Sequence, residues 1–284
     1  MNIAMLGLHA TGKTSYAVGV YAGMTYGSYE GLRLVKVTES VATLNAGLER
    51  LSRLEAVGRT DGSEAETIGL QVRTDDDRLH ELRVPDRSGE ALRGTLHGRS
   101  WDPELLEEVK DADGVLLFLR PGETRQGEPV TEVASLMGAV QDHDEDARET
   151  EWDPSMMPTD AQMVDALQEL SDVVGMKSLP VAVVVSAWDE AEAQSPEEWL
   201  KSRVPLLSQY LEANPERFLA AAFGVSVQGK TFLSVADDDL ADVGTAEIPV
   251  NEPDPWRRAS CVDRFGDSVE LVAPLVWVIG KVDN

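Results

Sequence analysis

Cysteine and basic residues are scarce in this sequence, and both shortages restrict what the protein can be. Cys261 is the only cysteine among 284 residues, so an intrachain disulfide is impossible. A chain without disulfides fits a reducing compartment, and we therefore expect a cytoplasmic protein. The 25 basic residues stand against 51 acidic ones, which makes the net charge -26. Such a charge repels nucleic acids and anionic membranes, so we expect neither as a partner.

Long apolar stretches are also missing. No segment approaches the roughly 18 uninterrupted apolar residues that indicate a transmembrane helix. Residues 1–8 are apolar but lack the basic segment and the long apolar stretch of a signal peptide. We therefore expect no insertion into a membrane. The hydrophobic content of 42 % is enough for a large core. No repeat or convincing linker divides the chain, so we predict one domain over residues 1–284.

A phosphate-binding loop stands near the start of the chain. Residues 7–14 read Gly-Leu-His-Ala-Thr-Gly-Lys-Thr and fit G-x-x-x-x-G-K-[ST], between an apolar strand pattern and a helix pattern. The backbone N–H groups of such a loop form a nest for phosphates, which Lys13 extends to the β- and γ-phosphates. The Thr14 hydroxyl is placed to ligate Mg²⁺. The residues that we expect at the phosphates are Gly7, His9, Ala10, Thr11, Gly12, Lys13, Thr14 and Ser15.

Strand and helix patterns alternate after this loop. Residues 113–119 and 180–186 are continuous apolar runs, typical of strands buried on both faces of a parallel sheet. Residues 67–73 and 79–86 resemble a hairpin. We therefore predict an α/β fold with a mostly parallel central sheet, helices on both faces and one antiparallel hairpin strand. A strand–helix insertion at about 28–58 and an acidic insertion at about 120–160 interrupt the pattern.

A second phosphate-facing motif follows the hairpin. Residues 86–89 read Asp-Arg-Ser-Gly, a D-x-x-G sequence at the end of an apolar strand. In a phosphate-loop enzyme, Asp86 would hold Mg²⁺ and the Gly89 N–H would meet the γ-phosphate. An ordinary turn is the alternative interpretation of D-x-x-G by itself. Its place downstream of an intact phosphate loop favours the functional interpretation.

The order of motifs resembles the GTPase branch of phosphate-loop proteins. Residues 186–189, Ser-Ala-Trp-Asp, stand where those proteins carry [NT]-K-x-D, and Ser226-Val227 stand where a Ser-Ala-like loop follows a late strand. Within this branch the chain is similar to the bacterial double-GTPase (DO-GTPase) family. The similarity lies in the strand–helix insertion, the D-x-x-G-E sequence and the segment Pro274–Trp277.

This resemblance implies a Mg²⁺-dependent switch protein that binds GTP or GDP and hydrolyses GTP. It also implies protein partners within a bacterial conflict, defence or signalling system. Thr67 would close over Mg²⁺ and the γ-phosphate and act in hydrolysis with Lys13 and Glu90, and Thr60 is the alternative switch threonine. Asp189 would recognise guanine. The other residues expected beside the base are Ser186, Trp188, Ser226 and Val227.

Two departures from the family pattern leave alternatives open. Ala187 replaces the lysine whose stem covers the guanine ring, so Trp188 or another side chain would have to do this. Glu90 replaces the usual water-orienting glutamine. Its carboxylate could polarise water but also repels the γ-phosphate, so hydrolysis could be slow or need a partner. The alternatives are a nucleotide-binding scaffold without useful turnover and an ATP-using NTPase or kinase.

Overall fold

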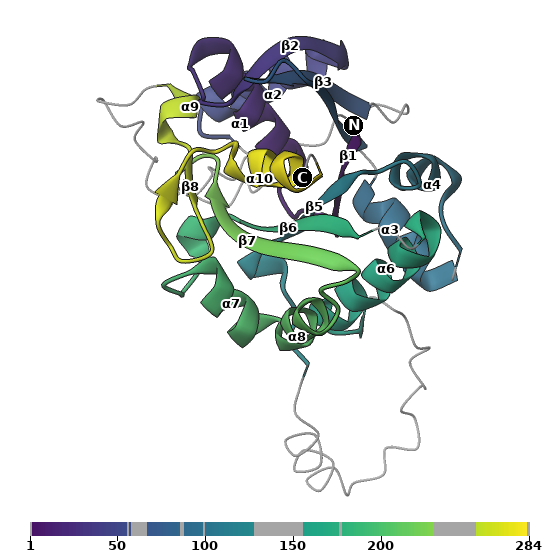
Figure 1. Cartoon of the computed structure of the whole chain (residues 1–284). Coiled ribbons are helices and arrows are strands. Elements are labelled where there is room, and N and C mark those ends of the chain that lie inside the picture. The colour runs from purple at the N-terminus through teal and green to yellow at the C-terminus, as the bar shows by residue number, and fades with distance from the viewer. Residues whose placement is uncertain are drawn as a thin grey trace, which may run out of the picture.

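A single nine-stranded sheet organises the chain (Figure 1). The computed structural model describes residues 2–55, 57, 67–85, 88–98, 100–127, 156–175, 178–229 and 254–282. The strands are β1 (Asn2–Gly7), β2 (Leu32–Glu39), β3 (Thr67–Thr74), β4 (Leu79–Pro85), β5 (Gly114–Leu119), β6 (Leu179–Ser186), β7 (Phe218–Ser226), β8 (Ser260–Val262) and β9 (Ser268–Val269).

The sheet has the order β2-β3-β4-β1-β5-β6-β7-β8-β9. Strands β4, β1, β5, β6 and β7 pair in parallel, so the predicted mostly parallel sheet is confirmed. The predicted hairpin is also present, because β3 runs antiparallel between β2 and β4. A second antiparallel strand, β8, pairs with the end of β7 and with β9. Sequence patterns did not predict this hairpin, because its strands are only three and two residues long.

Helices cover both faces of the sheet, as predicted (Figure 1). The helices and short 3-10 turns are α1 (Lys13–Tyr26), α2 (Val41–Ser52), α3 (Ser88–Gly98), α4 (Pro103–Val109), η1 (Pro121–Glu123), α6 (Thr159–Val174), η3 (Trp188–Glu190), α7 (Pro196–Arg203), α8 (Pro205–Ala213), α9 (Pro255–Arg258) and α10 (Ala273–Val282). Within the described ranges, none of these helices combines the length and apolar character needed to cross a bilayer.

Alternating side chains of the central strands divide the core into two layers. Ile3 and Met5 of β1 point into the layer with α1, α2 and α10, whereas Ala4 and Leu6 point into the layer with α3, α4, α6, α7 and α8. Successive side chains of a strand face opposite sides, so both faces of β1 are buried. The residues of β5 and β6 are all buried as well. This double burial explains their uninterrupted apolar sequences.

The strand–helix insertion is attached near the end of β7. The Leu51 carbonyl oxygen, at the C-terminal end of α2, accepts a hydrogen bond from Gln228 Nε2 at 3.0 Å. Arg258 Nη2 donates to the same carbonyl at 2.9 Å. A helix end leaves its last carbonyls without intrahelical partners, and these buried donors satisfy one of them. The contacts hold the end of α2 close to the loop that follows β7.

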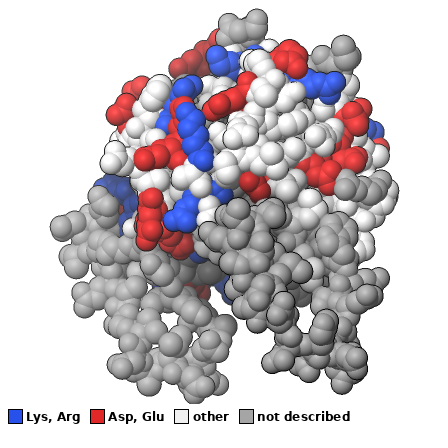
Figure 2. Space-filling view, turned by 90° about the horizontal axis from the view of Figure 1, so that it is seen from below, with Lys and Arg blue, Asp and Glu red and all other residues white. Residues whose placement is uncertain are grey.

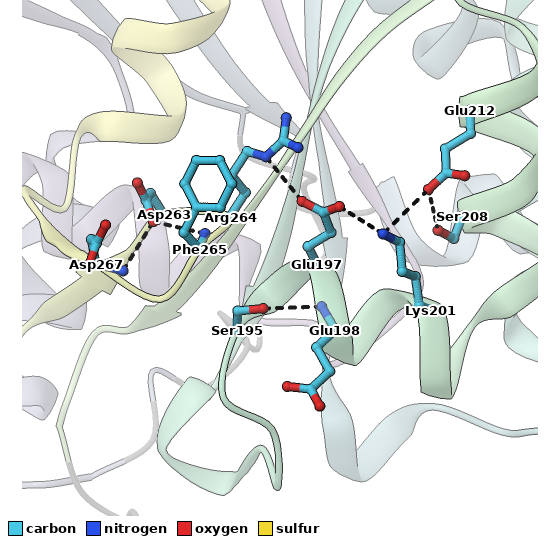
Figure 3. A network of polar contacts seen from close by, with 10 residues as sticks. All are labelled: Ser195, Glu197, Glu198, Lys201, Ser208, Glu212, Asp263, Arg264, Phe265 and Asp267. Atoms are coloured by element: carbon cyan, nitrogen blue, oxygen red, sulfur yellow. Dashed lines mark hydrogen bonds and ion pairs between the residues drawn. The ribbon is translucent and has the colours of Figure 1, made fainter.

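A polar network attaches the β8–β9 hairpin to α7 (Figure 3). Arg264 Nε lies 3.0 Å from Glu197 Oε2, and Lys201 Nζ lies 2.8 Å from Glu197 Oε1. Ser195 caps α7 by accepting a hydrogen bond from the Glu198 N–H at 3.2 Å. Basic and acidic side chains are interspersed over the face seen from below, where α7 and α8 lie (Figure 2). The strongly acidic chain thus pairs part of its charge locally.

The network makes the stability of this region dependent on pH. The hydrogen bond from Lys201 and the nearby Arg264 charge hold the pKa of the Glu197 carboxyl below its usual value. The stabilisation is therefore present above the ordinary glutamate pKa and is lost as the pH falls through the lowered pKa. We expect Glu197→Gln to reduce the free energy of unfolding at pH 7 by about 0.5 kcal/mol, as for partly exposed ion pairs.

Urea unfolding measured from pH 7 to pH 3 tests this expectation. The difference between wild type and Glu197→Gln should shrink as the wild-type carboxyl becomes protonated. Glu216→Gln, at an exposed turn, is the matched control and should leave the stability unchanged. A constant difference between wild type and Glu197→Gln across the pH range would mean that packing, and not charge, anchors the hairpin.

Candidate functional site

A cavity lies at the edge of the sheet where the parallel strands end. Strands β1, β5, β6 and β7 are neighbours and run in parallel, so the loops that follow them meet at one edge. The cavity measures about 390 Å³, within the range of ordinary ligand pockets. Of the residues predicted from sequence, it is lined by His9, Ala10, Gly12, Ser15, Ser186, Asp189, Ser226 and Val227.

The phosphate-binding loop has a conformation that depends on its glycines. Gly12 has φ +82°, and a Cβ there would lie 3.1 Å from the Ser186 Cβ and Oγ. Gly7 has φ +151°, and a Cβ there would lie 2.7 Å from the Phe118 carbonyl oxygen. These backbone angles and close approaches favour glycine. The loop is thereby pressed between the ends of β5 and β6.

Lys13 and the start of α1 form the cationic part of this loop. Lys13 is buried, and its Nζ donates to the Gly7 carbonyl at 2.9 Å and the Leu8 carbonyl at 2.7 Å. Thr11 Oγ1 donates to the Leu8 carbonyl at 2.8 Å. Gly12, the N-cap of α1, has no side chain to accept from the first-turn amides, and no acidic residue lies in that turn. This helix end therefore fits an anionic ligand.

Gly89 lies directly against the phosphate-binding loop. A Cβ at Gly89 would lie 2.6 Å from the His9 nitrogen and 2.8 Å from the Leu8 carbonyl carbon. Gly89 and the loop are therefore in backbone contact, although about eighty residues separate them in sequence. Gly89 and Glu90 belong to the first turn of α3. Asp86 and Thr60 lie outside the described residues.

Thr67 lies at the same edge of the sheet but outside the cavity lining. It is the first residue of β3 and stands opposite Pro85, the last residue of β4. Because β3 is antiparallel to β4, its first residue lies where β4 ends, on the side of the phosphate-binding loop. The structure thus brings Thr67 close to the end of the strand that precedes the D-x-x-G motif. It does not place Thr67 among the residues lining the cavity.

Asp189 and Ser226 meet where the loops after β6 and β7 line the cavity. The Ser226 hydroxyl donates a hydrogen bond to Asp189 Oδ1, and the Gly229 N–H donates to Ser226 Oγ at 3.2 Å. The parallel pairing of β6 with β7 brings these two loops together. Asp189 remains exposed, whereas Ser226 is buried. The arrangement orients a carboxylate, an acceptor of two hydrogen bonds, toward the cavity that it lines.

Ser186 and Trp188, beside Asp189, take different positions. The Ser186 hydroxyl is buried at the cavity and has no hydrogen-bond partner among the described residues. A bound ligand can satisfy it, and an unsatisfied buried hydroxyl is unfavourable. Trp188 instead packs over Gly224, where a Cβ would lie only 2.4 Å from its indole ring. Trp188 does not line the cavity, so the structure does not bring it to the place expected from sequence.

Five lining residues were not predicted as site residues: Val57, Arg120, Ala187, Glu190 and Gln228. A sequence signal existed for two of them. Arg120 directly follows the buried strand β5, and Glu190 lies in the loop after the buried strand β6. Loops that follow such strands are where α/β proteins bind ligands. No comparable signal marks Val57. It reaches the cavity because α2 is anchored through Leu51 to the segment after β7.

Comparisons with known proteins identify the family of this chain. The family model described as DO-GTPase1, Double-GTPase 1, matches residues 4–278. No curated protein matches the sequence. Solved structures with some similarity include the signal recognition particle receptor SRb-GTP/SRX complex from Chaetomium thermophilum, at 15 % sequence identity and a TM-score of 0.39. The match covers 79 % of this chain and 90 % of the chain in that complex. Sup35 complexed with GDP matches at 17 % identity and a TM-score of 0.34, covering 79 % of this chain and 36 % of that one.

The contact of Gly89 with the loop leads to a stability prediction. In Gly89→Ala the new methyl group would meet backbone atoms of Leu8 and His9, which cannot move without displacing the loop. We expect a loss of about 1–3 kcal/mol in the free energy of unfolding, as for overpacking in a well-packed interior. Urea unfolding measures it.

Gly94→Ala, in the same helix, is the matched control. A Cβ at Gly94 meets nothing within 4 Å, so alanine should stabilise α3 by about 0.5–1 kcal/mol. Equal effects of the two substitutions would contradict a specific contact between Gly89 and the phosphate-binding loop.

Proposed function

This chain belongs to the Double-GTPase 1 family, and on that premise we propose that it is a GTP-binding and GTP-hydrolysing switch protein. The observation that carries the proposal is one cavity with two different ends. A glycine-dependent phosphate-binding loop forms one end, and the Asp189 carboxylate supported by Ser226 forms the other. A guanine nucleotide has the matching chemistry, with phosphates at one end and two adjacent N–H donors on its base at the other.

The phosphates are bound by the loop and the start of α1. The ammonium group of Lys13 exchanges its contacts with the Gly7 and Leu8 carbonyls for phosphate oxygens, while the loop amides and the helix dipole supply further positive potential. In a chain with a net charge of -26, such local compensation is needed to hold a polyanion. A bound Mg²⁺ would supply further positive charge beside the phosphates.

The metal ligands that we propose are Thr14, Thr67 and Asp86. Thr14 is in the first turn of α1, and its hydroxyl is a hard oxygen ligand of the type that Mg²⁺ prefers. Thr67 and the end of β4 share the edge of the sheet next to the loop. Gly89, in contact with the loop, is suited to sense the γ-phosphate and to pass its presence to α3. This contact is the element that makes the protein a switch.

Catalysis of hydrolysis is assigned to Lys13, Thr67 and Glu90. Glu90 follows Gly89 in α3, close along the chain to the expected γ-phosphate position. A carboxylate there can polarise a water molecule but also repels the γ-phosphate. We therefore propose slow hydrolysis, or hydrolysis that a protein partner accelerates. The family resemblance supports partners from a bacterial defence or signalling system and a cytoplasmic location.

Base selection gives the sharpest test of this function. Asp189 can accept hydrogen bonds from the guanine N1–H and exocyclic amine, whereas adenine offers no such pair of donors. Wild type should therefore bind GTP roughly a hundredfold more tightly than ATP, since a bound base covers the Asp189 carboxylate and adenine would leave it desolvated without a partner, at a cost of a few kcal/mol. Asp189→Asn should shift the preference toward xanthosine triphosphate, whose C2 carbonyl accepts from the new amide. Isothermal titration with the three nucleotides measures both effects.

Asp172→Asn, exposed on α6, is the control and should bind as wild type does. Suppose that wild type binds ATP as tightly as GTP, and that Asp189→Asn changes neither affinity. The protein would then be an ATP-using or unselective NTPase, and the guanine assignment would be wrong.

A second candidate function is a scaffold that binds GTP or GDP without useful turnover, which the glutamate at position 90 favours. Single-turnover assays with radiolabelled GTP separate the two functions. Wild type should release phosphate in the presence of Mg²⁺. Thr14→Val, which keeps the shape but removes the hydroxyl, should lower this rate at least tenfold while GDP binding without Mg²⁺ stays unchanged. No phosphate release by wild type, with or without a cell extract, would favour the scaffold.

A further inference from the structure

The loop after β6 presents no basic side chain to the cavity. Ala187 stands where the resemblance to GTPases calls for a lysine, and it contributes only a methyl group to the lining. Trp188 is packed on Gly224 and does not line the cavity, so it does not take the place of that lysine. A purine ring bound at Asp189 would therefore receive no cation from residues 186–189.

Arg120 reaches the same cavity from the neighbouring strand. It directly follows Leu119, the last residue of β5, and β5 lies between β1 and β6 in the sheet. Arg120 therefore starts between the phosphate-binding loop, which follows β1, and the loop that carries Asp189, which follows β6. Its side chain lines the cavity together with Ala187 and Asp189.

Glu190 fixes the orientation of the Arg120 guanidinium. Arg120 Nη2 donates to Glu190 Oε1 at 3.0 Å, and the two side chains are 29 % and 32 % exposed, so solvent only partly screens the pair. Arg120 Nε is buried and has no hydrogen-bond partner among the described residues. The guanidinium is thus positioned by one carboxylate, and its side chain lines the cavity.

We propose that Arg120 replaces the missing lysine and lies against the face of the bound guanine, with Glu190 as its positioning residue. A planar guanidinium stacks on an aromatic face and is attracted to its π-system, which suits it to this contact better than an ammonium group. The inference rests on the proposed function, because it requires a guanine nucleotide in this cavity. It adds a specificity-determining residue that comes from β5, outside the family motif at 186–189.

Ligands with and without a base distinguish a ring contact from a phosphate contact. In Arg120→Ala we expect the affinity for GTP and for GDP to fall about tenfold, the size of a partly desolvated cation–π contact. The affinity for inorganic tripolyphosphate, which has no ring, should stay as in wild type. Arg203→Ala is the matched control, because Arg203 is also paired to a glutamate, Glu192 at 3.7 Å, but does not line this cavity.

Two further variants test the replacement itself. The double variant Arg120→Ala/Ala187→Lys restores the cation from the position used in the family pattern, and most of the lost GTP affinity should return. Glu190→Gln keeps Arg120 but removes its anionic partner, so GTP affinity should fall about threefold with tripolyphosphate binding unchanged. Arg120→Lys, which keeps the charge without the planar group, should give an intermediate loss and serves if Arg120→Ala fails to fold.

Three results would overturn the inference. Unchanged GTP affinity in folded Arg120→Ala would show that the arginine does not contact the nucleotide. Equal losses for GTP and tripolyphosphate would assign Arg120 to the phosphates. Failure of Ala187→Lys to restore affinity would show that the two positions are not equivalent. Wild type that binds tripolyphosphate but no guanine nucleotide would instead overturn the proposed function, and the inference with it.

Discussion

The parallel alignment of β1, β5, β6 and β7 is the constraint on which the rest of this site depends. Parallel neighbours end at the same edge, so the loops after residues 7, 119, 186 and 226 are brought together although they are far apart in sequence. The alignment is stable because the strands are buried on both faces, between two separate layers of helices. The packing that aligns these strands therefore also brings the cavity-lining loops together.

Close backbone approach then sets the shape of the cavity. Gly7, Gly12 and Gly89 each stand where a Cβ would lie about 3 Å or less from a neighbouring segment: the end of β5, the end of β6 and the phosphate-binding loop itself. The loop is thus held by contacts on three sides. The start of α3 is thus mechanically coupled to the loop through Gly89, since a well-packed interior transmits small displacements.

Electrostatics at the cavity is local, because the molecule as a whole is strongly acidic. Lys13 and the amide groups at the start of α1 supply positive potential at the sheet edge, whereas basic groups elsewhere form ion pairs, such as Arg264 with Glu197. The acidic surface and the cationic loop are compatible because solvent screens exposed charges beyond about 10 Å. Binding of a polyanion therefore depends on a few groups and not on net charge.

The sequence by itself determined the local elements and the order of motifs. The spacing of apolar residues and glycines predicted the phosphate-binding loop, the strand preceding it, the buried strands β5 and β6 and the first hairpin. Such spacing is a property of residues that are close together in sequence. Only the tertiary structure decided which distant groups share the cavity. It packed Trp188 on Gly224, placed Val57 and Arg120 in the lining, and added the short β8–β9 hairpin. These outcomes depend on contacts between segments far apart in sequence, which no local pattern records.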